Sequence, residues 1–305
     1  MKTSITVGTR GSALALTQAN MVISALKLTY PELEVSTKII KTTGDKILDK
    51  ELSKIGGKGL FIKEIEEALL DKSIDLAVHS MKDVPHTLSE DFEIGTVLKR
   101  EDPRDVLICL NGYDINTLPG GAVIGTGSTR RMLQLSRIRP DFEFIPVRGN
   151  IDTRIRKLLN GEFDALVLAL AGIKRLGWQC REDLSIDYLD IKDFIPSVGQ
   201  GAMGLEIRKG DDEVADLIKI LNSKDDEVCV MAERAFLREI DGGCEIPVGA
   251  YAKIEGNQIT IDGFIGDENT KEIFREKIVG NMENFEELGV QLAKNCLSRR
   301  SRAGG

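Results

Sequence analysis

The sequence predicts an α/β protein with mainly parallel sheets in its first two-thirds and a small α+β domain in its last third. Short apolar runs alternate with amphipathic stretches as far as about residue 200, which is typical of strands followed by covering helices. After about residue 222 this alternation gives way to a helix, strand-like segments and a final helix. The 305 residues are enough for two or three domains.

Six short apolar runs in the first two-thirds are predicted strands. They are Ile5–Val7, Val35–Ile40, Ile74–Val78, Val106–Leu110, Ala122–Gly125 and Ala165–Leu170. The last run is apolar on both faces, as expected of a strand covered by helices on each side. Ala13–Leu28 is a predicted amphipathic helix, and Ser12 before it can accept a hydrogen bond from the first-turn amides.

Two segments predict domain boundaries. Lys99–Arg104 is charged and interrupted by a proline, and Ile195–Gly201 combines a proline with two glycines. The elements expected after the second boundary are the helix Asp226–Ile240, the strands Val248–Ile254 and Gln258–Ile265, and the helix Met282–Cys296. The basic residues from 299 onward are expected to form a solvated tail.

Composition excludes several classes of function. The net charge of −8 argues against a polyanionic partner, and an aromatic content of 5% argues against a stacking platform for nucleic acid. No run of 18 apolar residues predicts a membrane span, and no signal peptide is recognised. Five scattered cysteines and two histidines predict neither a disulfide framework nor a metal site. We expect a cytoplasmic protein.

Two glycine-containing turns, Gly8–Ser12 and Ile124–Arg131, each join a predicted strand to a predicted helix. Glycines let the backbone approach a ligand, and the free amides of a helix start attract anions. Each turn adds charges or hydroxyls, from Arg10 and Ser12 in the first and from Thr126, Ser128, Arg130 and Arg131 in the second. One such turn is commonplace, but two matching turns predict an anionic ligand held between two lobes.

More arginines follow predicted strands. Arg148 comes after the strand-like segment Phe142–Val147, Arg154 opens the next helix, and Arg175 lies just past the apolar run Ala165–Leu170. Open α/β sheets bind ligands at the carboxyl ends of their strands. Each arginine alone reads as a surface charge, but together, in a net-acidic protein, they favour a polycarboxylate site.

The segment Val78–Pro85 also follows a predicted strand. It places Asp83 beside Lys82 where a carboxylate could stabilise a developing cation or move a proton. The competing interpretation is an ordinary turn before a proline. His79 is expected to be structural.

Cys244 stands on a glycine turn before a predicted strand, whereas Cys109 and Cys229 lie in apolar segments typical of buried thiols. A thiol on such a turn can form a covalent bond. A second polar stretch, Thr42–Gly59, is interpreted as a surface loop or as a lid that brings Lys58 and the following Phe61 to a ligand.

Taken together, these segments resemble the porphobilinogen deaminase (hydroxymethylbilane synthase) family. The resemblance covers nearly the whole chain, in order, through Thr9–Ser12, His79–Pro85, Gly127–Arg131, Arg148–Asn150, Gly199–Ala202 and Gly242–Cys244. It implies two periplasmic-binding-protein-like (type II) lobes around a cleft and a small C-terminal α+β domain. The implied domains are 1–99 with 198–220, 100–197, and 221–305.

The resemblance also implies a transferase of tetrapyrrole biosynthesis. Such an enzyme condenses four porphobilinogen molecules head to tail, with loss of ammonia, to hydroxymethylbilane. Porphobilinogen would become an azafulvene-like electrophile, and a dipyrromethane cofactor would be joined to Cys244 by a thioether. A monomer without an obligate protein partner is expected.

Site residues carry over from the family onto matching positions. Asp83 is the implied catalytic carboxylate. The implied cofactor-binding residues are Cys244, Lys82, Asp83, Thr126, Ser128, Arg130, Arg131, Arg154 and Gly172. The implied substrate-binding residues are Arg10, Ser12, Gln18, Lys58, Phe61, Arg148, Arg154, Arg175 and Gln200. Glu245 departs from the neutral glutamine expected after the cysteine, which puts the rate of cofactor loading in doubt.

Two alternatives compete with this interpretation. A non-enzymatic two-lobed binding protein for a small carboxylate or phosphate would explain the arginines, but it would need neither Asp83 nor a cysteine in an appended domain. An acyl-transfer enzyme with Cys244 as nucleophile lacks an obvious histidine partner.

Overall fold

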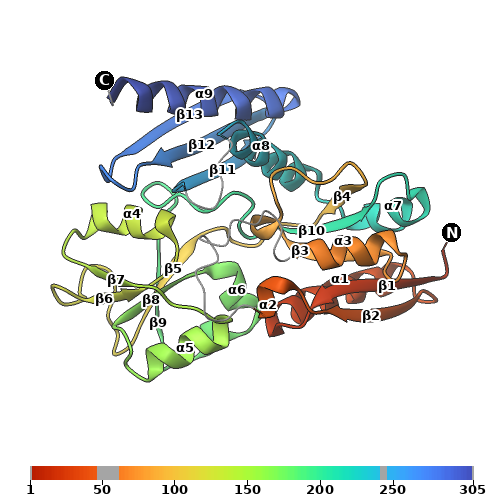
Figure 1. Cartoon of the computed structure of the whole chain (residues 1–305), viewed down its shortest axis with the longest axis horizontal. Coiled ribbons are helices and arrows are strands. Elements are labelled where there is room, and N and C mark those ends of the chain that lie inside the picture. The colour runs from red at the N-terminus through yellow and green to blue at the C-terminus, as the bar shows by residue number, and fades with distance from the viewer. Residues whose placement is uncertain (1, 47–61, 241–245, 304–305) are drawn as a thin grey trace. The chain divides into compact units, whose positions relative to one another are not determined.

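The computed structural model describes residues 2–46, 62–240 and 246–303. The chain divides into two compact units, residues 1–101 with 202–230 and residues 102–201 with 231–305. In the described residues one five-stranded sheet lies in the first unit, and a five-stranded and a three-stranded sheet lie in the second (Figure 1). We call the first unit lobe 1, residues 102–201 lobe 2, and residues 231–305 the C-terminal region.

Lobe 1 is built on a mixed sheet. Its strands, in spatial order, are β2 (Glu34–Ile40), β1 (Ser4–Arg10), β3 (Leu76–Ser80), β10 (Met203–Arg208) and β4 (Phe92–Val97). β10 runs antiparallel to both neighbours, while β1 is parallel to β2 and β3. The helical elements of this unit are α1 (Ala13–Thr29), α2 (Thr43–Lys46), α3 (Lys63–Leu70), η2 (Met81–Asp83), α7 (Asp212–Ile218) and η4 (Lys219–Leu221).

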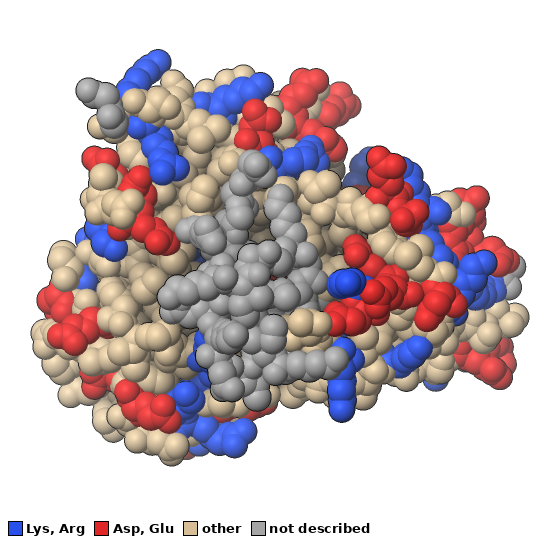
Figure 2. All heavy atoms as spheres, in the orientation of Figure 1, with Lys and Arg blue, Asp and Glu red and all other residues tan. Residues whose placement is uncertain are grey.

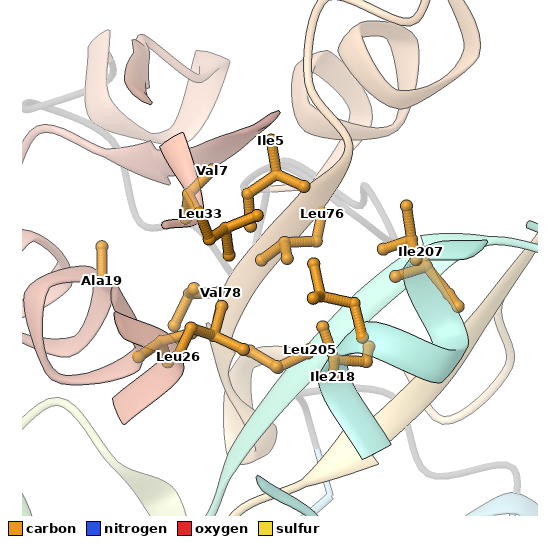
Figure 3. Close-up of a cluster of buried hydrophobic side chains, with 13 residues drawn as sticks. Ile5, Val7, Ala19, Leu26, Leu33, Leu76, Val78, Leu205, Ile207 and Ile218 are labelled. Atoms are coloured by element: carbon orange, nitrogen blue, oxygen red, sulfur yellow. The ribbon is translucent and has the colours of Figure 1, made fainter. Parts of the chain in front are cut away.

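Alternating residues of these strands make two separate cores. Leu76 and Val78 of β3 pack with Leu205 of β10 and Leu26 of α1 (Figure 3). Ala77, which points to the opposite face of β3, belongs to the core that α3 covers. Both faces of β3 are therefore buried, and its carboxyl end is held firmly at the edge of the sheet.

Lobe 2 repeats the plan. Its sheet has the order β7 (Glu143–Ile145), β6 (Val123–Gly125), β8 (Ala165–Ala169), β5 (Asp105–Cys109) and β9 (Ser185–Tyr188). β6 is parallel to β7 and β8, and β5 is antiparallel to β8 and β9. The helical elements are α4 (Thr129–Ile138), α5 (Ile151–Leu159), α6 (Leu170–Arg175) and η3 (Trp178–Cys180).

The C-terminal region is an antiparallel sheet with helices against it. β11 (Val248–Glu255), β12 (Gln258–Gly266) and β13 (Ile273–Asn281) pair in chain order. The accompanying helices are α8 (Lys224–Ile240), η5 (Met282–Asn284) and α9 (Phe285–Ala303). A Cβ on Gly263 of β12 would meet both Phe236 of α8 and Leu292 of α9, so the two helices pack closely on this strand.

The predicted fold class is confirmed: two sheet–helix lobes are followed by a small α+β region. The sheets of the two lobes are mainly parallel, as predicted, since four strands of each five-stranded sheet run in one direction and one strand, β10 or β5, runs antiparallel to its neighbours. β5 and β10 are the first strands formed after the chain passes from one unit to the other, so no helical crossover sets them parallel to a neighbour.

The described residues from 299 onward are mostly exposed, as predicted, but they are helical and do not form an irregular tail, because α9 continues to Ala303. Arg300 and Arg302 lie in its last turn, where positive charge stabilises a helix terminus. No described helix combines the length and apolarity that crossing a membrane requires.

Candidate active site

A small pocket lies at the carboxyl ends of β1 and β3 in lobe 1. Its volume is about 60 Å³. It is lined by Arg10, Ser12, Leu14, Ala15, Gln18, Ile62, Val78, His79, Ser80 and Asp83. Because parallel strands β1 and β3 end at the same edge, turns that are 70 residues apart in sequence meet there. The pocket unites four of the predicted residues, Arg10, Ser12, Gln18 and Asp83.

Hydrogen bonds fix the turn that leads into α1. The Ser12 hydroxyl accepts from the Ala15 amide at 3.3 Å and caps the helix, as predicted. Thr9 Oγ1 donates to the Ala15 carbonyl at 3.1 Å. Gln18 is buried one turn further along, where its Nε2 donates to Ser80 Oγ at 2.9 Å. This contact joins α1 to the end of β3, and Ser80 is a pocket residue that motif analysis did not single out.

The short η2 turn presents Lys82 and Asp83, both exposed, directly after β3. The Met81 amide donates to the Ala202 carbonyl at 3.0 Å. A Cβ on Gly204 of β10 would overlap Met81 Sδ, so the absence of a side chain there leaves room for Met81. Asp83 is thus an exposed carboxylate on a turn whose base is anchored in the sheet.

A buried histidine–glutamate pair adjoins the pocket, since His79 is one of the residues that line it. His79 Nε2 is 2.7 Å from Glu206 Oε2, and Glu206 is completely buried. In the described part of lobe 1, Glu206 Oε1 has no hydrogen-bond partner. Burial, together with the charge on Glu206, raises the pKa of Glu66 on α3, while His79 opposes that rise. His79 is therefore a structural partner of Glu206, in agreement with its predicted role.

The second predicted turn lies at the carboxyl ends of the parallel strands of lobe 2. The Ser128 amide donates to Thr126 Oγ1 at 3.2 Å, and the Ser128 hydroxyl caps α4 by accepting from the Arg131 amide at 3.4 Å. Thr126 is itself held by a bond from its amide to the Ile145 carbonyl of β7. The turn is therefore built into the sheet edge, as its sequence predicts.

Arg130 and Arg131 point inward from this turn and share one carboxylate. Arg130 donates to Asp105 Oδ2 at 2.7 Å, and Arg131 donates to Asp105 Oδ1 at 2.7 Å and 3.0 Å. The two arginines are 6% and 8% exposed, and Asp105 is 0% exposed. Burial alone would raise the pKa of Asp105, but the charges and hydrogen bonds of both arginines outweigh it and hold that pKa below its ordinary value.

The other predicted residues of lobe 2 lie on or next to neighbouring loops. Arg154 Nε donates to the Gly149 carbonyl at 2.7 Å, next to half-buried Arg148. Arg175 donates to the Gly201 carbonyl at 2.6 Å, and Gln200 Nε2 donates to the Pro103 carbonyl at 2.7 Å. Gly172 is buried within α6. Arg175 and Gln200 thus tie the segment that leaves lobe 2 to its surroundings.

The cysteines separate by environment. Burial raises the pKa of the Cys109 and Cys296 thiols to about 12, so both are poor nucleophiles. Cys229 is buried and Cys180 is exposed. Cys244 lies outside the described residues, as do Lys58, Phe61 and Glu245. No group of three potential metal ligands occurs among the residues that the structure describes.

A larger hollow of about 600 Å³ involves lobe 2 and the C-terminal region, and no predicted site residue lines it. Its Gln134 is bonded to the Ile195 backbone, and its Arg275 is bonded to Asp262. We assign it no ligand. On the face drawn in Figure 2, acidic and basic side chains are interspersed among the coloured residues, and these form no broad basic surface there.

The fold defines a two-lobed α/β protein extended by an α+β region. Two family models match it: "Porphobilinogen deaminase, dipyromethane cofactor binding domain" over residues 5–216 and "Porphobilinogen deaminase, C-terminal domain" over residues 227–298. The chain belongs to the porphobilinogen deaminase family.

Curated relatives agree with the family models. The porphobilinogen deaminase of Syntrophobacter fumaroxidans is 47% identical over 298 residues, which cover 98% of this chain and 96% of that protein. That of Syntrophus aciditrophicus is 48% identical over 291 residues, covering 95% and 94%. That of Geobacter sulfurreducens is 47% identical over 292 residues, covering 96% and 91%.

Among solved structures, the periplasmic VFT2 domain of Bordetella pertussis BvgS has a TM-score of 0.42 at 14% identity, covering 76% of this chain and 92% of that one. The probable amino-acid ABC transporter extracellular-binding protein ytmK from Bacillus subtilis has a TM-score of 0.42 at 14% identity, covering 72% and 89%. Likenesses of this size carry no argument about function.

Family membership confirms the predicted enzyme class, a hydroxymethylbilane synthase of tetrapyrrole biosynthesis, and the predicted dipyrromethane cofactor. It favours this interpretation over the non-enzymatic binding protein and over the acyl-transfer enzyme. Sequence reasoning missed Asp105. An acidic residue at the start of the apolar run Val106–Leu110 was the available signal, because a buried carboxylate requires a partner.

Proposed function

We propose that the lobe 1 pocket holds an acidic substituent of porphobilinogen and that Asp83 is the catalytic carboxylate. The observation that carries this proposal is that Arg10, Ser12, Gln18 and Asp83 line one pocket. A pyrrole with acetate and propionate side chains offers anions to an arginine and an N–H donor to a carboxylate. An arginine and a carboxylate in one pocket are complementary to both features.

The pocket volume limits what it can hold. About 60 Å³ is the space of a few water molecules, which is enough for one carboxylate. Arg10 binds that carboxylate as a charge-assisted donor, and Ser12 and Gln18 add neutral donors. We propose that the rest of the ring lies outside the pocket, against the exposed face of Asp83.

Asp83 acts on charge that appears during each addition. The C–N bond of the substrate's protonated aminomethyl group breaks, the nitrogen leaves as ammonia with the electron pair of that bond, and positive charge spreads over the pyrrole ring. Asp83 accepts a hydrogen bond from the ring N–H and stabilises that positive charge. A C–C bond then forms to the methylene carbon, and the attacking ring carbon releases its hydrogen as a proton, which Asp83 can take up.

The remaining substrate contacts are proposed for residues on the other predicted loops. They are Lys58, Phe61, Arg148, Arg154, Arg175 and Gln200. Four condensed pyrroles carry eight carboxylates, so a growing product needs more cations than one pocket supplies. Lysines and arginines on several loops would share that charge.

We propose that the dipyrromethane cofactor is joined to Cys244 and that lobe 2 holds its carboxylates. The cluster of Arg130, Arg131 and Asp105 fits this group, because two buried guanidiniums share one carboxylate and keep a net positive charge. Thr126, Ser128, Arg154 and Gly172 would complete the contacts in lobe 2, and Lys82 and Asp83 those in lobe 1. When bound, the dipyrromethane supplies the pyrrole carbon to which the first substrate is joined.

Several broader features belong to the same proposal. The domains are 1–99 with 198–220, 100–197, and 221–305. The enzyme works in the cytoplasm as a monomer, without an obligate protein partner and without binding nucleic acid. The net charge of −8 supports the last point, because it repels polyanions.

Intact-mass spectrometry of the denatured protein tests the anchor. Protein made in cells unable to form porphobilinogen is expected to gain the mass of two linked pyrroles when it is incubated with that compound. The Cys244→Ser variant should not gain it, whereas the matched Cys180→Ser variant, which removes an exposed thiol elsewhere, should. Loading of Cys244→Ser would move the anchor to another residue, and failure of the unaltered protein to load would overturn the proposed function.

A further inference from the structure

Asp105 joins the two arginines of the α4 turn through both of its oxygens. Arg130 bonds to Oδ2, and Arg131 bonds to Oδ1 through two of its nitrogens. Each guanidinium is held again by a backbone carbonyl, Arg130 by Ile195 at 2.6 Å and Arg131 by Val167 at 3.0 Å. Both guanidinium planes are therefore oriented by groups of the protein itself.

The charges in this cluster do not balance. Two arginines, which remain protonated in proteins, face one carboxylate, and no other carboxylate is recorded in an ion pair with either of them in the described residues. All three side chains are at least nine-tenths buried. A buried cluster with one excess positive charge attracts a further anion, since an uncompensated buried charge is costly.

Without the charge of Asp105, the cluster would contain two adjacent buried cations with no anion between them. Mutual repulsion would then push the guanidiniums apart. The backbone carbonyls of Ile195 and Val167 would be the only recorded acceptors left to them. The shape of the cluster therefore depends on Asp105, although Asp105 itself has both oxygens engaged by the arginines.

We propose that Asp105 is a positioning residue that holds Arg130 and Arg131 together in a cluster with one net positive charge, which binds one carboxylate of the cofactor. This inference rests on the proposed function of the two arginines. It assigns to Asp105 both a charge role, which leaves a single excess positive charge, and a geometric role, which fixes the guanidinium planes.

Two variants separate the two roles. Asp105→Asn keeps the shape and removes the charge, and Asp105→Glu keeps the charge and lengthens the side chain by one methylene. Both should slow the gain of dipyrromethane mass at least tenfold when protein made in cells unable to form porphobilinogen is incubated with that compound. Asp141→Asn is the matched control, because Asp141 pairs with Arg139 in the same lobe on the surface, and it should load at the normal rate.

Chemical rescue distinguishes positioning from general stability. In Asp105→Ala, added formate should restore part of the loading rate and raise the thermal midpoint, because a free carboxylate can occupy the emptied position between the guanidiniums. Chloride at equal ionic strength should do neither. The thermal midpoint of each variant is measured as well. If a variant is unfolded at the assay temperature, its loading rates with and without formate are compared at a temperature below its midpoint.

The outcomes are distinct. If the unaltered protein fails to gain mass, the proposed function fails and this inference falls with it. If the unaltered protein loads, and Asp105→Asn and Asp105→Glu each load as fast as the unaltered protein, the inference alone is overturned. If only Asp105→Asn is slow, the geometric role is refuted. If formate has no effect on Asp105→Ala, the charge role is refuted.

Discussion

The replacement of Asp83 by Asn tests the central chemical proposal. The substitution keeps the size of the side chain and removes its charge, so the turn between Met81 and Val84 should remain in place. Asp83 is exposed. The loss of rate caused by the substitution therefore depends on how much water remains around this side chain when substrate is bound. The fold should be unaffected, because it does not depend on the charge of an exposed carboxylate.

The magnitude follows from the distance between opposite charges. A carboxylate about 4 Å from a unit positive charge stabilises it by about 4 kcal/mol at an effective dielectric constant near 20, and by about 1 kcal/mol in bulk water. Since about 1.4 kcal/mol corresponds to tenfold in rate, kcat should fall about a thousandfold when substrate excludes water, and at least about fivefold otherwise.

The assay is ammonia release together with intact-mass analysis of the enzyme carrying zero to four added pyrroles. Asp83→Asn protein that carries the cofactor should add the first pyrrole far more slowly than the unaltered enzyme, and Asp83→Glu should recover part of the rate. Asp91→Asn, which removes another exposed carboxylate from lobe 1, should behave like the unaltered enzyme. A fully loaded Asp83→Asn enzyme with kcat within about twofold of normal would refute the electrostatic argument.

Three further predictions concern the framework of the site. His79→Leu should destabilise the protein by about 3–5 kcal/mol because Glu206 would lose its buried partner. The double variant His79→Leu with Glu206→Met should recover most of that loss in thermal unfolding, and equal stability of all variants would contradict the pairing. The pKa of Glu66 is raised, so its favourable contribution is present below the unfolded value of 4.5 and lost as pH rises through the folded value; Glu66→Gln should therefore raise the thermal midpoint at pH 7 and not at pH 4. Gly289→Ala should cost about 1–3 kcal/mol, because its Cβ would overlap the Ala232 carbonyl oxygen; an unchanged midpoint would show that α9 shifts freely.

Local patterns predicted the strands whose residues are apolar throughout. Ala165–Leu170 was expected as a doubly covered strand, and β8 occupies Ala165–Ala169. β10 was not predicted. Its Gly204 and Glu206 break the apolar pattern, and its place depends on pairing with β3, more than 120 residues earlier in the chain. The periodicity of apolar residues alone could not predict a strand whose position depends on pairing with strands distant in sequence.

The same distinction holds for the site. Arg10, Ser12 and Asp83 could be proposed as candidates because each belongs to a turn that directly follows a predicted strand. The structure brings these three residues to one pocket. The buried ion pairs of Asp105 and Glu206 were not predicted because their partners are distant in sequence. A charged residue within an apolar strand was the visible signal, but the sequence does not specify its partner.

The position of β10 has a consequence for biosynthesis. β10 lies between β3 and β4, so the sheet of lobe 1 stays split until residues 203–208 have been made. The ribosome must first deliver all of lobe 2, about 100 residues, which takes roughly 5–20 s at ordinary elongation rates. During that interval β3 and β4 present unpaired edges, so nascent chains halted before residue 203 should depend on chaperones more than chains released after it.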